Sequence, residues 1–219
     1  MAPPFVERYR EAFGRTWDGG TPIARVRFVV LDSETTGLNP RTDKVITIGA
    51  VAVQDGEIVL EDSFDALVKV AYDGSSVTVH GVTRDESARG LDEAVALEGF
   101  IDYLRDAVIV GHHIAHDVST LDVACTRHWD FTLLNRVLDT MDLTLYLESA
   151  GAFGGRPPIR HFTLDALCGM FGVIPHDRHT AGGDAFLTAQ VFQRLLRLAV
   201  RHDRATLDRI CEPFPIPAD

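Results

Sequence analysis

The chain has few cysteines, no long apolar run and little positive charge. Cys125, Cys168 and Cys211 are widely spaced and form no C-x-x-C pair. This pattern argues against a disulfide framework and against a structural zinc site, and it suggests a reducing compartment, the cytoplasm. No stretch approaches the roughly 20 apolar residues of a membrane helix, so no membrane association is expected. The first residues, MAPPFVERYREAF, lack the apolar centre of a secretory signal.

Basic residues are also outnumbered, because 21 Lys and Arg against 32 Asp and Glu give a net charge of −11. Proteins that bind along a nucleic-acid duplex neutralise phosphates with Lys and Arg, and the charge balance argues against tight binding of that kind. It does not exclude a protein that grips only a chain end, since a carboxylate site that holds divalent cations becomes locally positive. The length of 219 residues and the hydrophobic fraction of 46% fit one large globular domain.

Apolar runs rich in β-branched residues predict three early strands. VRFVVLD at 26–32 and VITIGAVAV at 45–53 have the composition of strands that are buried on both faces. The pair Asp55-Gly56 precedes a third run at 57–60 and is a strong hairpin signal. The three strands are therefore predicted to form a meander in which the second and third are antiparallel.

Helices and strands alternate in the rest of the chain. A capping box, Thr83-Arg84-Asp85-Glu86, and the apolar spacing that follows it predict a helix over 83–105. Further strands are expected at 107–110 and 136–138, and further helices at 117–128, 164–171 and 183–202. A segment rich in glycine and proline at 149–158 is expected to be a loop.

Two carboxylates follow the first predicted strand. Asp32 ends the strand and Glu34 lies two residues further on. Positions i and i+2 of an extended chain point to the same face, so both carboxylates would be forced together, and a cation would relieve their repulsion. A polar turn explains the same residues, because Asp, Ser, Thr and Gly are common in turns. The pair alone leaves a metal site and a polar turn equally open.

Two more carboxylates begin predicted helices, at the head of stripes that are otherwise apolar: Asp117 and Asp184. The helix macrodipole favours an acid at this position, which explains either residue singly. Oxygen ligands select hard cations, so two ions of Mg²⁺ or Mn²⁺ are expected rather than Zn²⁺. Two such ions activate a water and stabilise the leaving oxygen of an in-line displacement. His179, just upstream of Asp184, is suited to accept the proton of that water, although a solvated loop histidine is the competing interpretation.

Six segments occur in an order and spacing that resemble the DEDDh 3′–5′ exonuclease family: VVLDSETTGL, VITIGAVAV, VHGVT, VGHHIAHD, FTLDALC and HTAGGDA. The resemblance spans about Phe28 to Leu198 and is greatest to the proofreading branch, which contains the epsilon subunits of bacterial DNA polymerase III. It implies a ribonuclease H-like α/β fold with a five-stranded mixed sheet flanked by helices. Residues 26–202 would form the exonuclease domain, after an N-terminal extension of residues 1–25 and before a C-terminal tail of residues 203–219.

The resemblance also implies a role for each motif residue. Asp32 would be shared by two Mg²⁺ or Mn²⁺ ions, with Glu34 and Asp184 on one of them. Asp117 would support the other ion, and His179 would be the general base. Contacts to the terminal nucleotide are implied for Thr35, Thr36, Leu38, His80 and Val82.

The implied activity is hydrolysis from the 3′ end of nucleic acid, which releases nucleoside 5′-monophosphates. Thr35-Thr36 resembles the DNA-proofreading branch more than the oligoribonuclease branch. Single-stranded 3′ ends of DNA are therefore the expected substrate, and a DNA polymerase or another replication or repair protein is an expected partner. An RNA-trimming or short-oligonucleotide exonuclease on the same fold is the alternative, as is a polymerase-associated binding module.

The chain departs from the family pattern at several positions. His113 and His116 stand where the family usually has Asn and Phe, and Thr47 stands where Glu is common. A histidine beside Asp117 is expected to alter the pKa of that acid.

Two rival metal sites involve the same histidines. His112 and His116 have the H-x₃-H spacing of a zinc hydrolase helix, but His113 replaces the glutamate that such a helix needs. His116-Asp117 also resembles the His-Asp pair of all-helical metal phosphohydrolases, and the strong early strands argue against that architecture.

Overall fold

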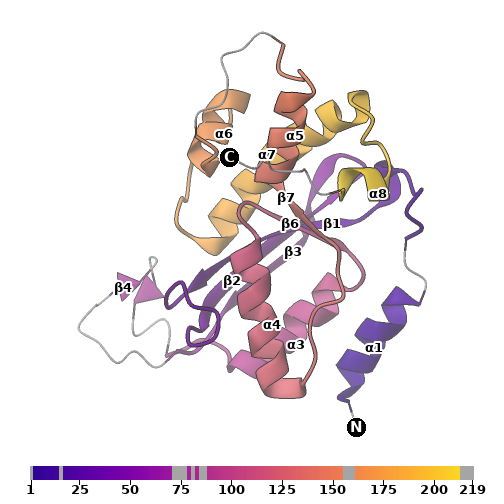
Figure 1. The fold of residues 1–219 in the computed structure, drawn as a ribbon. Helices are drawn as coiled ribbons and strands as arrows, with labels where there is room; N and C mark the ends of the chain where they lie inside the picture. The colour runs from indigo at the N-terminus through magenta and orange to yellow at the C-terminus, as the bar shows by residue number, and fades with distance from the viewer. Residues whose placement is uncertain are drawn as a thin grey trace.

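A computed structural model describes residues 2–14, 17–70, 78–79, 82–83, 88–154 and 161–212. Its centre is a five-stranded mixed sheet in the order β3-β2-β1-β6-β7 (Figure 1). The strands are β1 (Phe28–Thr35), β2 (Val45–Gln54), β3 (Glu57–Leu67), β6 (Val108–Gly111) and β7 (Val137–Asp139). β1 pairs antiparallel with β2 and parallel with β6, and β7 is parallel to β6. A separate antiparallel pair joins β4 (Thr78–Val79) and β5 (Val82–Thr83).

The predicted meander of the first three strands is confirmed. β2 and β3 are antiparallel and are joined by Asp55 and Gly56. These two residues have φ values of 51° and 74°, the positive values that a tight two-residue hairpin turn requires. β1 extends beyond its predicted end at Asp32 as far as Thr35, and this extension keeps Glu34 within the strand.

The described helices are α1 (Pro4–Phe13), α3 (Glu93–Leu104), α4 (Ala115–Trp129), α5 (Thr140–Ser149), α6 (Leu164–Phe171), α7 (Ala181–Arg201) and α8 (Leu207–Ile210), with a short 3₁₀ helix at Ile23–Arg25. Predictions for α4, α6 and α7 are confirmed to within two residues. α1, α5 and α8 were not predicted. None of the helices in the described part of the chain is both long and apolar enough to cross a membrane.

The predicted helix at 83–105 is wrong at its start. The capping box falls partly in 84–87, outside the described residues, and α3 begins only at Glu93. The preceding backbone pairs with the end of β3 instead: Leu91 N–H donates to Leu67 O, and Lys69 N–H donates to Leu91 O, both at 2.8 Å. A Cβ on Gly90 would lie 2.7 Å from the backbone of Val68. This backbone pairing takes the donors and acceptors that a longer helix would need.

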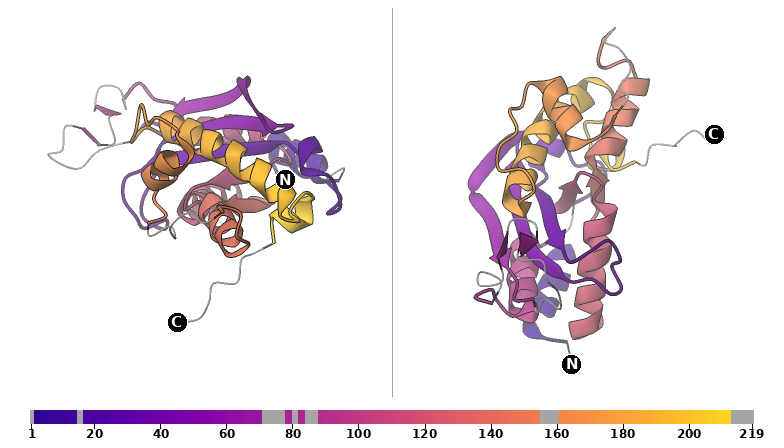
Figure 2. Two further views of the ribbon diagram at one scale, coloured as in Figure 1. Left: turned by 90° about the horizontal axis from the view of Figure 1, so that it is seen from above. Right: turned by 90° about the vertical axis from the view of Figure 1, so that its left-hand side faces the viewer.

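Each face of the sheet carries its own hydrophobic core. Val29 and Leu31 of β1 pack into the cluster that includes α1, α3 and α4. Phe28 and Val30, at the alternate positions, pack into the cluster that includes α5, α6 and α7. The long helix α7 lies across β1 and β2 on this second face, as the views in Figure 2 show. The alternation of β1 therefore decides toward which helices its last residues point.

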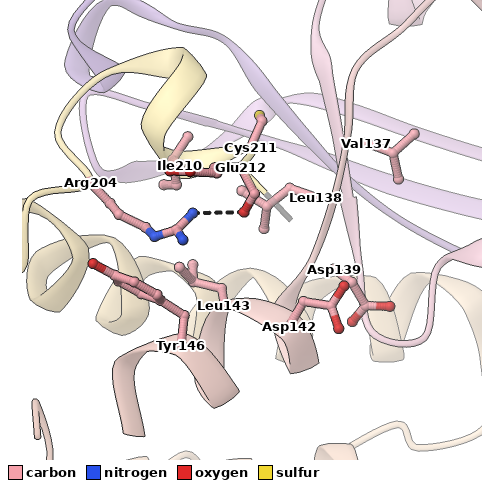
Figure 3. Close-up of a pocket in the computed structure, with 10 residues that line it drawn as sticks. All are labelled: Val137, Leu138, Asp139, Asp142, Leu143, Tyr146, Arg204, Ile210, Cys211 and Glu212. Carbon is pink, nitrogen blue, oxygen red and sulfur yellow. Dashed lines mark hydrogen bonds between the residues drawn. The ribbon is translucent and has the colours of Figure 1, made fainter. Parts of the chain in front are cut away.

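The terminal segments pack against the sheet domain. Phe5, Val6 and Tyr9 of α1 are buried in the first core, beside α3. Near the other terminus, the buried Arg204 side chain donates to the carbonyl of Glu212 and lies 3.6 Å from the centre of the Tyr146 ring. This arginine lines a small cavity of about 110 Å³ between β7, α5 and α8. Figure 3 shows the residues that line it. Parts of the expected N-terminal extension and C-terminal tail are thus folded onto the domain.

Candidate active site

The end of β1 presents two carboxylates to the face covered by α7. Asp32 and Glu34 continue the alternate series of Phe28 and Val30, so both side chains point to that face. Asp184 lies in the first turn of α7, and oxygen atoms of the three acids lie within 4.8 Å of one another. Because Asp32 and Glu34 are strand residues, they do not form the polar turn that was the competing interpretation.

Gly49 allows the N-terminus of α7 to reach this face. It is the partner of Asp32 across the β1–β2 ladder. A Cβ on Gly49 would lie 2.3 Å from Gly182 N and 2.4 Å from Ala181 C, distances that no side chain tolerates. The backbone of α7 therefore rests directly on β2, and Asp184 is held over β1. An isolated glycine in a strand often marks such a close approach, so the sequence held a signal for this contact.

Asp117 approaches the site from the opposite face of the sheet. Ser33 belongs to the series of Val29 and Leu31, so its side chain points toward α4. Both its backbone N–H (2.9 Å) and its hydroxyl (2.7 Å) donate to Asp117 Oδ1. Asp117 is 8% exposed and lies outside the group of three acids. Ser33 was missed because no spacing rule marks a residue between two acids as their support.

Asp139, at the end of β7, fixes the start of α4. Its carboxylate accepts hydrogen bonds from the N–H groups of His113 (3.2 Å) and Ile114 (3.1 Å) in the loop before α4. It also caps α5 by accepting from Met141 N–H at 2.8 Å. His113 has a φ of 57°, and its backbone is held in this conformation by that contact. Asp139 thus sets the position from which Asp117 projects. Its place at the carboxyl end of a parallel strand was an available signal.

Burial raises the pKa of two of the acids, Asp32 and Asp117. Burial raises the pKa of Asp32 to about 9, and the negative charges of Asp117, Asp184 and Glu34 add to the effect. Burial also raises the pKa of Asp117, while the hydrogen bonds from Ser33 and the nearby His116 oppose that rise. Asp184 is 8% exposed, and its Oδ1 has no hydrogen-bond partner among the described residues. Clustered carboxylates with an orphaned buried oxygen fit a divalent cation, which would satisfy that oxygen and offset the repulsion.

The positively charged side chain of Arg178 also lies at the site. Its guanidinium forms an ion pair with Asp184 Oδ2 and two hydrogen bonds with Asp165, at 2.7 Å and 3.3 Å. These contacts raise the pKa of Arg178 above its usual value, the hydrogen bond to Asp165 most strongly. This residue was not predicted, because nothing in the spacing of Arg178 distinguishes it from a surface arginine.

His179 lies on the loop that leads into α7. Its backbone N–H is 3.4 Å from Asp184 Oδ2, its φ is 64°, and its side chain is exposed. The next residue, Thr180, caps α7 by accepting from Gly183 N–H at 3.1 Å. A Cβ on Gly183 would lie 2.1 Å from Asp177 O, so the loop is packed tightly against the first turn of the helix. His179 therefore stands at the rim of the carboxylate group.

The residues expected to contact a terminal nucleotide are only partly brought together. Thr35 is 7% exposed, and its hydroxyl donates to Gly37 O at 2.7 Å. Thr36 Oγ1 donates to Asp43 at 3.1 Å and accepts from Lys44 N–H at 3.0 Å. Leu38 is 89% exposed on the β1–β2 loop. His80 lies outside the described residues, and Val82 is described only as part of the β5 backbone.

The rival zinc site is not assembled. His112 Nδ1 lies 3.0 Å from Thr140 Oγ1, whereas His116 Nε2 lies 3.4 Å from Thr35 Oγ1. Burial lowers the pKa of His112. Within the described ranges, the acids around Asp32 are the group of His, Cys, Asp and Glu side chains close enough to share a metal ion.

A mixed sheet of this order, with helices on both faces, is the ribonuclease H-like fold of known exonucleases. The structure of E. coli Exonuclease I in complex with a dT13 oligonucleotide aligns with a TM-score of 0.66 at 19% identity, over 81% of this chain and 42% of that one. The model of the exonuclease family RNase_T matches residues 29–192, and the chain belongs to this family. It therefore carries a nuclease domain of the hydrolase class.

Two relatives by sequence have names that refer to DNA polymerase III. The chain is 34% identical over 175 residues to the DNA polymerase III PolC-type of Thermotoga petrophila. The aligned region covers 78% of this chain and 12% of that protein. It is 36% identical over 184 residues to a DNA polymerase III subunit epsilon-like protein of Rhodobacter capsulatus, over 80% of this chain and 24% of that protein. The chain thus spans a quarter or less of the length of these relatives.

Proposed function

We propose that the chain is a 3′–5′ exonuclease of the DEDDh type that removes nucleoside 5′-monophosphates from single-stranded DNA ends. The observation that carries this proposal is the convergence of Asp32, Glu34 and Asp184, with Asp117 beside them. Asp32 and Glu34 come from β1 and Asp184 from α7, and Asp117 of α4 is close enough for its charge to act on Asp32. Such a group of buried and half-buried acids is costly without a cation, which supports a catalytic purpose.

Each acid has a distinct place in the proposed mechanism. Asp32, Glu34 and Asp184 would hold one divalent cation, and Asp32 with Asp117 would support a second. Two such ions of Mg²⁺ or Mn²⁺, when bound, activate the attacking water and stabilise the leaving oxygen. A ring nitrogen of His179, at the rim of the group, accepts the proton of that water.

The terminal nucleotide would lie over the β1–β2 loop. The side chain of Leu38 is free to pack against the last base, because it is 89% exposed. Thr35 and Thr36 use their hydroxyls within the loop, so we assign their contacts to the backbone. His80 and Val82 complete the proposed pocket, and residues 26–202 form the proposed exonuclease domain.

Preference for DNA and association with a polymerase or a repair protein are supported by the names of the relatives and by the dT13 strand of the structural neighbour. RNA trimming is the second candidate, because the acids do not distinguish the two sugars. A polymerase-associated module is compatible with the same fold.

Side-by-side digestion of labelled strands tests the proposal. Single-stranded DNA, duplex DNA and RNA are incubated with Mg²⁺ and with Mn²⁺, and products are separated from strands labelled at either end. We expect immediate release of mononucleotides from the 3′ label and a ladder of shortening products from the 5′ label.

Asp32→Ala and Asp184→Ala should each lower the rate by more than the roughly 10–100-fold that is typical of residues supporting a metal ligand. Unchanged release by either variant would refute the mechanism. Equal rates on DNA and RNA would remove the preference for DNA, and release that starts from the 5′ end would reverse the polarity.

A further inference from the structure

A groove lined by arginines lies on the outer side of α7, away from the carboxylates. It measures about 410 Å³ and lies between the segment after α5, the end of α6 and the second half of α7. Its lining residues are Ala152, Phe153, Met170, Phe171, Arg194, Arg197, Leu198 and Arg201. None of these described lining residues is acidic, although acids exceed bases by 11 in the chain as a whole. The groove therefore presents positive charge beside apolar surface.

The arginines form one row because of their spacing. Arg194, Arg197 and Arg201 lie at positions i, i+3 and i+7 of α7, which is one side of a helix. The helix macrodipole favours cations only in the last turn, so it accounts for Arg201 but not for Arg194. The ion pair of Arg197 with Glu57 is long, at 3.7 Å, and both side chains are exposed. Most of the positive charge of the row is therefore available to a partner.

Aromatic side chains form the apolar part of the groove. Phe153 and Phe171 are half-buried and pack edge to face, with ring centres 6.2 Å apart. A row of cations beside aromatic rings is the arrangement that binds single-stranded nucleic acid, in which the cations follow the phosphates and the rings contact bases. An acidic peptide offers negative charge as well, but a nucleic-acid strand has a charged phosphate and a planar base in every repeating unit, and the row of cations beside the rings fits both.

We propose that this groove binds the substrate strand upstream of the 3′ end that is cut. The inference rests on the proposed exonuclease function and extends it to a second contact with single-stranded nucleic acid. Asp184 begins α7, and at 1.5 Å per residue Arg194 and Arg201 lie about 15 Å and about 26 Å further along the helix axis. With phosphates about 3.4 Å apart in a stacked strand, the groove would be reached only by strands longer than about 4 to 8 nucleotides.

Strand length is therefore the variable that tests the groove. The double variant Arg197→Gln/Arg201→Gln is compared with the native chain on a labelled trinucleotide and on a strand of about 20 nucleotides. We expect unchanged hydrolysis of the trinucleotide and roughly tenfold weaker binding of the long strand, measured by fluorescence polarisation with the metal chelated. The dependence of binding on salt should fall by about 0.7 in log–log slope for each arginine removed. Arg10→Gln, on the exposed side of α1 across the sheet, removes a charge elsewhere and should change neither quantity.

The outcomes separate the two proposals. If the native chain hydrolyses the trinucleotide but the double variant binds the long strand as tightly as native, the groove proposal is wrong and the exonuclease proposal stands. If the native chain hydrolyses neither strand, the exonuclease proposal is wrong, and the groove proposal, which rests on it, is wrong as well. An equal loss of long-strand binding in Arg10→Gln would mean that net charge matters and the groove does not.

Discussion

The two ends of α7 carry opposite charge and are built in opposite ways. At the N-terminal end, Asp184 is buried, and it meets acids that come from two other elements. At the C-terminal end, three arginines follow one another along a single helix and border an open groove. The first site depends on how the sheet and helices pack, whereas the row of arginines in the second depends on the periodicity of one helix.

This difference has a physical basis. Carboxylates that are gathered in a buried place repel one another, and they stay close together because the packed backbone around them holds them there. Gly49 and Ser33 are parts of that backbone arrangement. Exposed arginines are solvated, so no packing is needed to keep them in a row. We therefore expect substitutions near the N-terminal end to have large effects on structure and activity, and substitutions in the groove to have small ones.

The largest effect is expected from Gly49→Ala. The added Cβ would overlap the backbone of Ala181 and Gly182, so the start of α7 and with it Asp184 must move. We expect a loss of about 1–3 kcal/mol of unfolding free energy and of about 100-fold in nuclease activity. Chemical denaturation and rate assays measure both.

Gly169→Ala is the matched control for this substitution. Gly169 lies within α6, and a Cβ added there would have no atom of another residue within 4 Å, apart from its own helix backbone and chain neighbours. Alanine at this position should be neutral or should stabilise the helix by up to about 1 kcal/mol. Full activity of Gly49→Ala would show that the close approach of α7 to β2 does not position Asp184.

The next effect is expected from Ser33→Ala. Its hydroxyl donates to Asp117 Oδ1 at 2.7 Å, so alanine removes one of the two hydrogen bonds that Ser33 supplies to this acid. The backbone bond remains, and we expect a fall of about 10-fold in activity with little change in stability. Ser119→Ala is a control in the same helix, because the hydroxyl of Ser119 donates to the carbonyl of Ala115 in that helix. A loss of activity as large in Ser119→Ala would show that the effect comes from α4 as a whole.

Much of the sheet and part of the carboxylate site could be predicted from the sequence. Strand composition and the Asp55-Gly56 turn predicted the meander, and the i, i+2 spacing of Asp32 and Glu34 predicted their shared face. Those inferences succeed because they depend on local geometry. Ser33 could not be found in this way, since its partner Asp117 lies on α4, whose position relative to β1 only the packed sheet defines. Arg178 could not be found either, because it joins Asp165 of α6 to Asp184 of α7 and the packing of these two helices is not visible in the sequence.

Two signals in the sequence were available but not used. Gly49 interrupts a run of β-branched residues. Asp139 stands at the end of a parallel strand, just as Asp32 stands at the end of the strand predicted at 26–32. The start of α3 was predicted too early, because the pairing of Leu91 with the end of β3 is non-local and competes with helical hydrogen bonds.

A more moderate effect is expected from Arg178→Gln. Arg178 pairs with Asp184, where a divalent cation is proposed to bind, so cation and guanidinium compete for the same carboxylate. Without metal, the variant leaves Asp184 without its partner and should lose about 1–3 kcal/mol of stability. Mn²⁺, followed by electron paramagnetic resonance of the free ion, should bind several-fold more tightly.

Arg194→Gln serves as the control for Arg178→Gln. Arg194 donates to the carbonyl of Gln190 in its own helix and should affect neither stability nor Mn²⁺ binding. Weaker Mn²⁺ binding by Arg178→Gln would mean that Arg178 positions Asp184 and does not compete for it.

The smallest effect is expected from Arg201→Gln, and it decides whether the two ends of α7 differ as argued. Arg201 is exposed in the last turn of the helix, where the macrodipole adds only a screened contribution. Its removal should change the unfolding free energy by less than about 0.5 kcal/mol, as for most surface substitutions. Urea denaturation of Arg201→Gln and of Gly49→Ala under the same conditions measures both changes in unfolding free energy. A loss above about 1 kcal/mol would show that Arg201 supports the fold, and a residue held by the fold would be less free to bind a strand.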